Sequence, residues 1–189
     1  QNIISHNLKR LGIKKYKYNS IFYLTIQEKE WCNDILNEYT KPIISICTKS
    51  KEPVKNWPID YWCKLVKILT SKFTIIHLGD NKEPELEGVI RMAGKYSMRE
   101  SAALISISQL FIGPDSLLMH IANGLEIKSI IIFGGSRPVR CFGYENNINL
   151  SSNPACSPCW IHEGHESCTK ELECMRSISV QKILSNVLR

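Results

Sequence analysis

Polar and charged residues follow several short apolar runs of this sequence, at the points where the strands of a sheet would end. The residues concerned are Thr48, Ser50 and Lys55, an acidic group around Glu83, and Asp115 with Ser116 and His120. Lysines can neutralise a diphosphate as point charges, while hydroxyl and backbone N–H groups donate to its oxygens. An acidic residue after the second strand of a nucleotide-binding sheet suits a ribose diol. These residue types predict a site for a phosphorylated, nucleotide-like ligand.

Some of these candidates have competitors among their neighbours or ordinary structural roles. Asp80, Glu85 and Glu87 lie close enough in sequence to Glu83 to take its place at a ribose. Taken singly, Lys55 could be an ordinary surface lysine. An isolated aspartate before a helix could simply be the cap of that helix. The functional hypothesis depends on all of these residues meeting at one sheet edge.

A cluster of four cysteines lies near the end of the chain, with the spacing Cys156-x2-Cys159-x8-Cys168-x5-Cys174. Four thiolates, with one pair at this close spacing, can hold a tetrahedral metal ion. His162 and His165 lie within the cluster and could replace a cysteine. A closed four-ligand site leaves no position for a substrate, so we expect a structural zinc ion, with iron as second choice. Reduced thiols or disulfides in a surface loop are the alternative.

Strand-like and helix-like segments alternate along most of the chain. The expected strands are 20–24, 43–47, 73–78, 110–112 and 129–133, with a short apolar piece at 89–93. The expected helices are 3–11, 25–39, 58–69, a charged one containing Glu83, Glu85 and Glu87, then 97–106, 117–125 and 177–188. This alternation predicts an α/β fold, a Rossmann-like parallel sheet with helices on both faces.

The stretch from Leu110 to Pro138 is expected to form the centre of the site. It reads as a strand, a turn, a short helix and a second, parallel strand. Asp115 or Ser116 can cap the helix by accepting hydrogen bonds from its first turn. A helix N-terminus at the carboxyl edge of a parallel sheet favours an anion.

The composition limits the class of protein. A chain of 189 residues, 43% hydrophobic and 22% charged, can bury the core of one domain. The formal charge of +6 suits phosphate-bearing or acidic-membrane partners, but it is spread along the chain, which makes nucleic acid an unlikely partner. No apolar stretch is long enough to span a membrane and no signal peptide is visible, so we expect a cytoplasmic protein. Because the first residue is Gln1 rather than Met, we expect the chain to be cut from a longer one.

Several short motifs together resemble one known family. The motifs are Lys55-Asn56-Trp57-Pro58 with Trp62, Gly94 to Glu100, Asp115-Ser116 with Met119-His120, Phe133-Gly134 with Pro138, and Cys156-Ser157-Pro158-Cys159 to Cys174-Met175. In order and spacing they resemble glycosyltransferase family 9, the ADP-heptose:lipopolysaccharide heptosyltransferases and their relatives. The resemblance covers Ile43 to the C-terminus and, more loosely, Asn7 to Tyr39.

The resemblance implies a GT-B architecture, in which two Rossmann-like domains face a cleft and the C-terminal one holds a nucleotide-sugar. By that similarity Lys55 contacts the diphosphate or sugar, with Thr48 and Ser50 nearby, and Glu83 contacts the ribose. The resemblance also places Tyr96 and Ser97 along the base, and Asp115, Ser116 and His120 around the sugar-diphosphate. The implied reaction is an inverting transfer, without a catalytic metal, of a heptose-like sugar from a nucleotide diphosphate to lipopolysaccharide or another glycan or lipid-linked acceptor. Such an acceptor implies peripheral contact with the inner membrane.

Two departures from the family pattern stand out. Members usually carry Gly two positions after the aspartate, where this chain has Leu117, whose side chain could obstruct or shift the diphosphate. The family's Gly-rich acceptor loop and proposed general base have no counterpart here. We therefore expect residues 1–40 to be the tail of an N-terminal acceptor domain or an interdomain segment, and residues 41–189 to be the donor-binding domain, with the catalytic base elsewhere.

Two rival functions remain compatible with the residues. A sugar-nucleotide epimerase shares this architecture, but it needs further acid and base residues at the sugar, where only Asp115 and His120 are evident. A non-catalytic module for nucleotide binding or assembly, stabilised by a metal at the cysteines, is the second rival, and Leu117 favours it.

Overall fold

The computed structural model describes residues 3–14, 19–40, 42–161 and 168–188. Its centre is a six-stranded sheet with the strand order β3-β2-β1-β4-β5-β6. Every pair of neighbouring strands is parallel. This is the order of a doubly wound Rossmann domain, so the predicted fold class is confirmed.

The strands are short and mostly apolar. They are β1 (Ile43–Ile46), β2 (Thr74–His77), β3 (Ile90–Arg91), β4 (Leu110–Pro114), β5 (Ser129–Ile132) and β6 (Ile148–Leu150). In the middle of the sheet Ile44 pairs with Ile75 on one side and with Leu110 on the other. Runs without polar alternation are typical of strands that are covered on both faces. The short edge strand β6 was not expected from the sequence.

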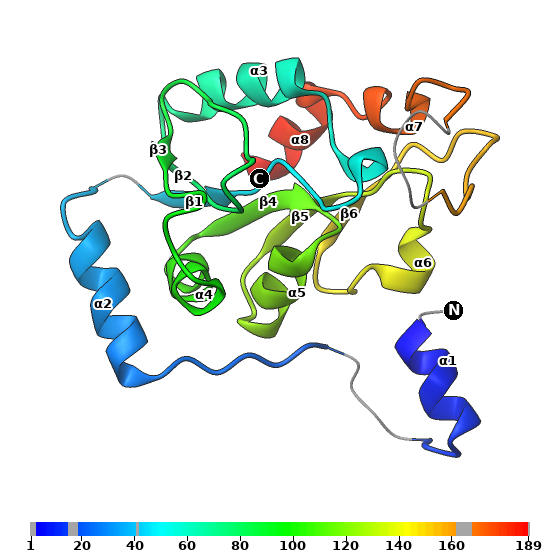
Figure 1. Cartoon of the computed structure of the whole chain (residues 1–189), viewed down its shortest axis with the longest axis horizontal. Helices are drawn as coiled ribbons and strands as arrows, with labels where there is room; N and C mark the ends of the chain where they lie inside the picture. The colour runs from blue at the N-terminus through cyan, green and yellow to red at the C-terminus, as the bar shows by residue number, and fades with distance from the viewer. Residues whose placement is uncertain (1–2, 15–18, 41, 162–167, 189) are drawn as a thin grey trace.

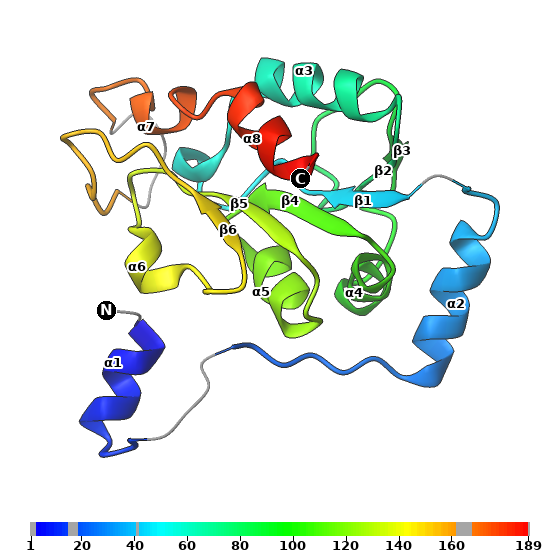
Figure 2. The same cartoon turned by 180° about the vertical axis from the view of Figure 1, so that it is seen from behind.

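Helices cover both faces of the sheet, as Figures 1 and 2 show from opposite sides. The helices are α1 (Ile3–Arg10), α2 (Ile26–Leu36), α3 (Ile59–Leu69), α4 (Met98–Ser106), α5 (Leu117–Gly124), α6 (Val139–Phe142), α7 (Glu173–Arg176) and α8 (Val180–Val187), with a 3-10 turn η1 (Pro53–Lys55). The pair α3 and α8 lies on one face, and α4 and α5 lie on the other, with α2 packed outside α4. Helix α1 lies apart from this layered body in both views.

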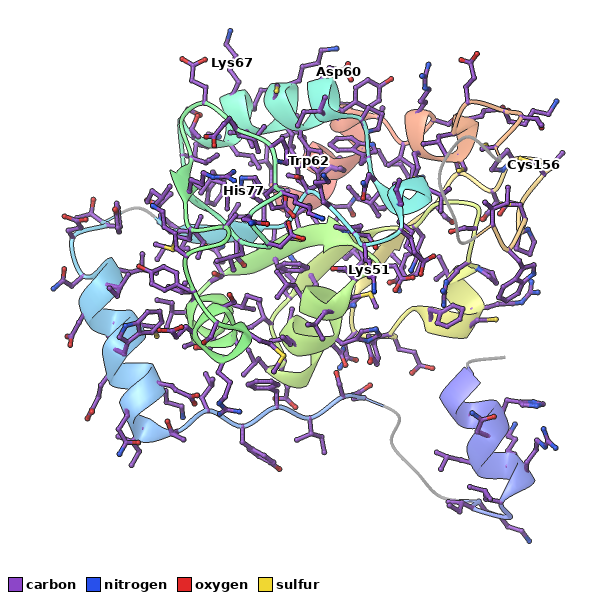
Figure 3. All side chains as sticks on the ribbon, in the orientation of Figure 1. Lys51, Asp60, Trp62, Lys67, His77 and Cys156 are labelled. Atoms are coloured by element: carbon purple, nitrogen blue, oxygen red, sulfur yellow. The ribbon has the colours of Figure 1, made fainter. Side chains whose placement is uncertain are left out.

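Alternate residues of the strands feed two separate cores. Ile130 and Ile132 pack in the core with Trp62 of α3, whereas Ile131 and Phe133 pack in the core of α4 and α5. In Figure 3 Trp62 lies between α3 and the sheet, while Lys67 on the same helix points outward. The sheet is thus held rigidly on both sides, which fixes the positions of the loops at its carboxyl edge.

Two helix starts are confirmed in detail. Thr25 and Ser97 each form a capping box, in which the hydroxyl accepts from the backbone three residues on and a glutamate bonds back. Arg99 links the two capped ends, because its guanidinium bonds to Glu28 and donates to the Tyr23 carbonyl at 3.0 Å. The Arg99 hydrogen bond and the Thr25 backbone lower the pKa of Glu28 to about 2. This pair fastens α2 to the start of α4.

Three expectations were wrong. Residues 20–24 are not a strand, because their backbone bonds to helix α5 instead: the Phe22 N–H donates to the Gly124 carbonyl at 3.1 Å. No helix forms at 83–87, where Pro84 interrupts the segment and the Glu83 side chain turns inward. The C-terminal helix begins at Val180 rather than Ser177, and the short α7 precedes it.

Within the ranges that the structure describes, no helix combines the length and apolar character that crossing a membrane requires.

Candidate functional site

A cavity of about 1240 Å³ opens at the carboxyl edge of the sheet. Its walls come from the loop after β1, the loop after β2, the start of α4 and the N-terminal half of α5. Arg137 and Phe142 also line it. These segments follow neighbouring strands, and the carboxyl ends of parallel strands form one edge. This is the place where ligands bind in open α/β sheets.

A buried ion pair forms part of the cavity wall. The Lys55 Nζ lies 3.0 Å from Asp115 Oδ2, and both side chains are more than nine-tenths buried. The η1 turn after β1 positions Lys55, and Asp115 follows β4 directly, one residue before the N-cap of α5. The Glu52 carboxylate lies 3.4 Å from the same ammonium and 2.9 Å from Arg137 Nη2. Four charged groups from three loops therefore meet in one network.

Glu83 ties the ends of β1 and β2 together beneath the cavity. Its Oε2 accepts from the Thr48 N–H at 3.0 Å and from the Thr48 hydroxyl, and lies 2.8 Å from His77 Nε2. Its Oε1 accepts from the Lys49 N–H at 3.1 Å. Burial raises the pKa of Glu83, but the hydrogen bonds from His77 and Thr48 outweigh it, so the net pKa is lowered. The carboxylate is therefore ionised at neutral pH, and its Oε1 also accepts from the Cys47 thiol at 3.5 Å.

His120 projects from α5 into the cavity wall. Its Nδ1 lies 2.8 Å from the Tyr144 hydroxyl, and Tyr144 is itself buried. Burial lowers the pKa of His120, an effect that Asp115 opposes and Lys55 reinforces. The imidazole is therefore neutral at pH 7. If the tyrosine donates to Nδ1, the proton lies on Nε2, which makes that nitrogen a hydrogen-bond donor.

An aromatic side chain, that of Tyr96, also lines the cavity. Tyr96 precedes α4 and packs edge-on against Trp31 of α2, with 5.1 Å between the ring centroids. Packing of this kind fixes the tyrosine ring in place, so it presents a rigid apolar surface to the cavity.

The structure brings most of the predicted site residues together. Those that line the cavity are Ser50, Lys55, Glu83, Tyr96, Asp115, Ser116 and His120. Two do not line it. Thr48 is buried and its hydroxyl donates to Glu83, and Ser97 is the N-cap of α4. The sequence predicted that Asp115 or Ser116 caps α5. This prediction is wrong, because the described structure shows no side-chain cap of α5 from either residue. Ser116 is the N-cap residue by position alone.

Two cavity-wall residues, Glu52 and Arg137, were missed from the sequence, and so was Tyr144, which contacts His120. Glu52 lies three positions before Lys55, and Arg137 lies in the loop after β5, so both follow strands and could have been found by that rule. Tyr144 carries no such signal, because it reaches His120 from beyond α6.

Leu117 is the first residue of α5 and lines the cavity. It is 58% exposed, which is unusual for a leucine in a concave site. Its side chain stands at the helix N-terminus, where an anion would approach.

The four clustered cysteines line a second, small cavity of about 100 Å³ behind the loop after β5. Burial, and then the neighbouring Cys168 and Cys159, raise the pKa of the Cys174 thiol. All eight cysteines are free thiols. Over the described residues, no three His, Cys, Asp or Glu side chains are gathered closely enough to hold a metal ion. His162 and His165, the other candidate ligands, lie outside the described residues.

Comparison with known proteins was made at the level of sequence and of fold. Lipopolysaccharide heptosyltransferase 2 of Salmonella typhimurium is 25% identical over 122 residues, which are 57% of this chain and 35% of that enzyme. The family 9 glycosyltransferase of Veillonella parvula superposes with a TM-score of 0.73 at 15% identity, over 95% of this chain and 56% of that one. The iron-containing dodecameric heptosyltransferase TibC of enterotoxigenic E. coli, in complex with ADP-D-beta-D-heptose, superposes with a TM-score of 0.67 at 21% identity, over 80% of this chain and 46% of that one.

The matches cover only a part of these larger proteins. The chain spans about a third of the curated relative and about half of the solved structures. At these identities the structural likeness shows the fold. The sequence pattern of glycosyltransferase family 9 (heptosyltransferase) itself matches residues 9–170, most of the chain. The chain therefore belongs to glycosyltransferase family 9.

Proposed function

We propose that the large cavity binds the nucleotide-sugar donor of a heptosyltransferase reaction, ADP-heptose or a close analogue. The observation that carries this proposal is the buried Lys55–Asp115 pair, with its 3.0 Å contact at the N-terminal end of α5. A cation and a helix N-terminus that face one cavity provide a site for a diphosphate. The cavity is large enough to hold a nucleotide-sugar, at about 1240 Å³.

Each wall of the cavity supports one part of such a donor. Lys55 and Ser50 would hold the diphosphate, and Glu83, which lines the same cavity, would accept from a ribose hydroxyl. Tyr96 would lie along the base. Asp115, Ser116 and His120 would surround the sugar and its phosphate, with the neutral His120 donating a hydrogen bond.

The reaction we propose is the transfer of the sugar to lipopolysaccharide or another glycan or lipid-linked acceptor, with inversion and without a catalytic metal. An acceptor hydroxyl attacks the anomeric carbon, the bond to the phosphate oxygen breaks, and the nucleoside diphosphate leaves. Lys55 and the α5 N-terminus would stabilise the charge that develops on that oxygen. The base that takes the hydroxyl proton would come from outside residues 41–189.

This assignment makes residues 41–189 the donor-binding half of the enzyme. Residues 1–40 would then be the tail of an acceptor domain or an interdomain segment. A lipid-linked acceptor would place the protein on the cytoplasmic side of the inner membrane, in peripheral contact with it.

A thermal-shift panel of nucleotide-sugars tests the donor proposal. Saturation with ADP-heptose should raise the melting temperature by about 5 °C, because ligand at about 100 times its Kd adds about 2.7 kcal/mol to stability. Asp115→Asn should remove most of this shift, since it removes the carboxylate that holds Lys55. Asp60→Asn, on the outer side of α3 (Figure 3), should leave it unchanged. Absence of a shift with every nucleotide-sugar would contradict the proposal and favour a non-catalytic module.

We also propose that Cys156, Cys159, Cys168 and Cys174 bind a structural zinc or iron ion. The four thiols line one cavity of about 100 Å³, and thiolates suit either metal. A metal would bring the four thiolates together and stabilise a long irregular loop.

Metal analysis of protein purified without chelator should find about one equivalent of zinc or iron. Cys168→Ser should lose most of that metal, whereas Cys63→Ser, an exposed cysteine on α3, should retain it. Less than about a tenth of an equivalent in the unaltered protein would exclude the metal site.

A further inference from the structure

One carboxylate oxygen joins two cations on the wall of the large cavity. Glu52 Oε1 lies 2.9 Å from Arg137 Nη2 and 3.4 Å from Lys55 Nζ. Glu52 and Lys55 belong to the loop after β1, at the two ends of η1, and Arg137 belongs to the loop after β5. All three side chains line the cavity. Glu52 thus connects two loops across the site.

The two carboxylates that contact Lys55 differ in their surroundings. Asp115 is 3.0 Å from the ammonium and its side chain is 8% exposed, so it forms part of the buried wall. Glu52 is farther from the ammonium, at 3.4 Å, and its side chain is 24% exposed. Of the two, Glu52 is the one that a ligand entering from the cavity could replace without dismantling the core.

Glu52 Oε1 contacts the Lys55 ammonium and the Arg137 guanidinium, the two groups that a phosphate oxygen would contact at this place. An ammonium and a guanidinium that converge on one oxygen are common partners of phosphate. Cations left without a counter-charge in a concave, partly dehydrated site are costly. When no ligand is bound, Glu52 adds a counter-charge for Arg137 and a second one for Lys55, which already pairs with Asp115.

We propose that Glu52 is an internal anion that occupies part of the diphosphate subsite, and that a nucleoside diphosphate displaces it from Lys55 and Arg137. This inference rests on the proposed function, because it takes the ligand to be a sugar-linked nucleoside diphosphate. Binding then exchanges one set of ionic contacts for another, so the affinity is lower than the two cations alone would allow. A ligand without a diphosphate cannot make this exchange.

Isothermal titration of the full chain with ADP and with adenosine tests this exchange. Glu52→Gln keeps the size of the side chain but removes its charge, so ADP should bind about tenfold more tightly than it does to the unaltered protein at low salt. Adenosine, which lacks the phosphates, should gain nothing. Glu87→Gln removes the same charge from an exposed position outside the cavity and should change the Kd for ADP less than about twofold.

A second variant shows that the gain depends on the cation that Glu52 contacts. In an Arg137→Gln background the Glu52→Gln change should bring a clearly smaller gain, as expected for two coupled side chains. Melting curves of every variant without ligand show that each is folded. The melting temperature of Glu52→Gln should be lower than that of the unaltered protein, because Lys55 and Arg137 each lose one ionic contact.

The outcomes separate this inference from the proposed function. If the unaltered protein binds ADP and Glu52→Gln binds it equally or more weakly, Glu52 is not a displaced anion, while the donor site stands. If neither protein binds ADP, the donor site itself is contradicted, and this inference with it. Binding by Glu52→Gln alone supports both.

Discussion

Lys55→Met should weaken the binding of ADP to this protein by about 100-fold, which corresponds to about 2.7 kcal/mol. Methionine keeps the length and apolar stem of the side chain but removes its charge. The side chain of Lys55 is 9% exposed, so its interaction with a diphosphate is poorly screened by solvent. The Kd for ADP, measured by titration calorimetry at fixed salt, gives the result directly.

Lys51→Met is the matched control for Lys55. Lys51 belongs to the same loop and lines the same cavity, but it is exposed. Its removal should weaken ADP binding less than about fivefold, and added salt should diminish this effect, as for other exposed charges. Similar losses for the two variants would show that the cavity attracts ADP only through its general positive field, without a specific role for Lys55.

Glu83→Ala should lower the free energy of unfolding by about 3–5 kcal/mol, the usual effect of removing one partner from a buried ionic network. The carboxylate accepts hydrogen bonds from the backbone N–H groups of Thr48 and Lys49 and contacts His77, so its removal leaves buried donors without an acceptor. Urea denaturation at pH 7 measures the change.

The same variant has a predicted pH dependence. The pKa of Glu83 is lowered in the folded protein, so its contribution is present above the pKa of the unfolded carboxyl group, near 4.5. That contribution is lost as the pH falls through the folded value. The difference between Glu83→Ala and the unaltered protein should therefore be large at pH 7 and smaller below about pH 4.

Glu85→Ala provides the control two positions away. Its side chain is 85% exposed and pairs with Arg91 at the surface, so the stability should change by less than about 0.5 kcal/mol. A loss below about 1 kcal/mol for Glu83→Ala would contradict the role of Glu83 as the tie between the two loops.

The regular part of the fold could be predicted from residue patterns. Alternating apolar segments indicated the order of strands and helices, and the helices expected from Thr25 and Ser97 begin at those residues with capping boxes. Residues 20–24 have the apolar character of a strand, but a strand also needs a neighbouring strand to pair with. Their partner is the end of α5, which no local pattern reveals.

The candidate site could be predicted as a place but not as a set of contacts. Strand ends identify the loops that meet at the sheet edge, so Lys55, Asp115 and His120 were placed together correctly. The direction of each side chain depends on packing between elements distant in sequence. For this reason two contacts could not be predicted: the hydrogen bond from the Thr48 hydroxyl to Glu83, and the contact of Tyr144 with His120.

The packing of the last helix against α3 has a consequence for the synthesis of the chain. Trp57 Nε1 donates to the Ile178 carbonyl at 2.8 Å, and α8 packs beside α3 on one face of the sheet. The core on that face cannot close until residues 178–187 have left the ribosome. Among the residues that the structure describes, the opposite core draws on positions before 145, so it can form earlier. One apolar face of the sheet in the nascent chain would thus stay uncovered until α8 has been synthesised.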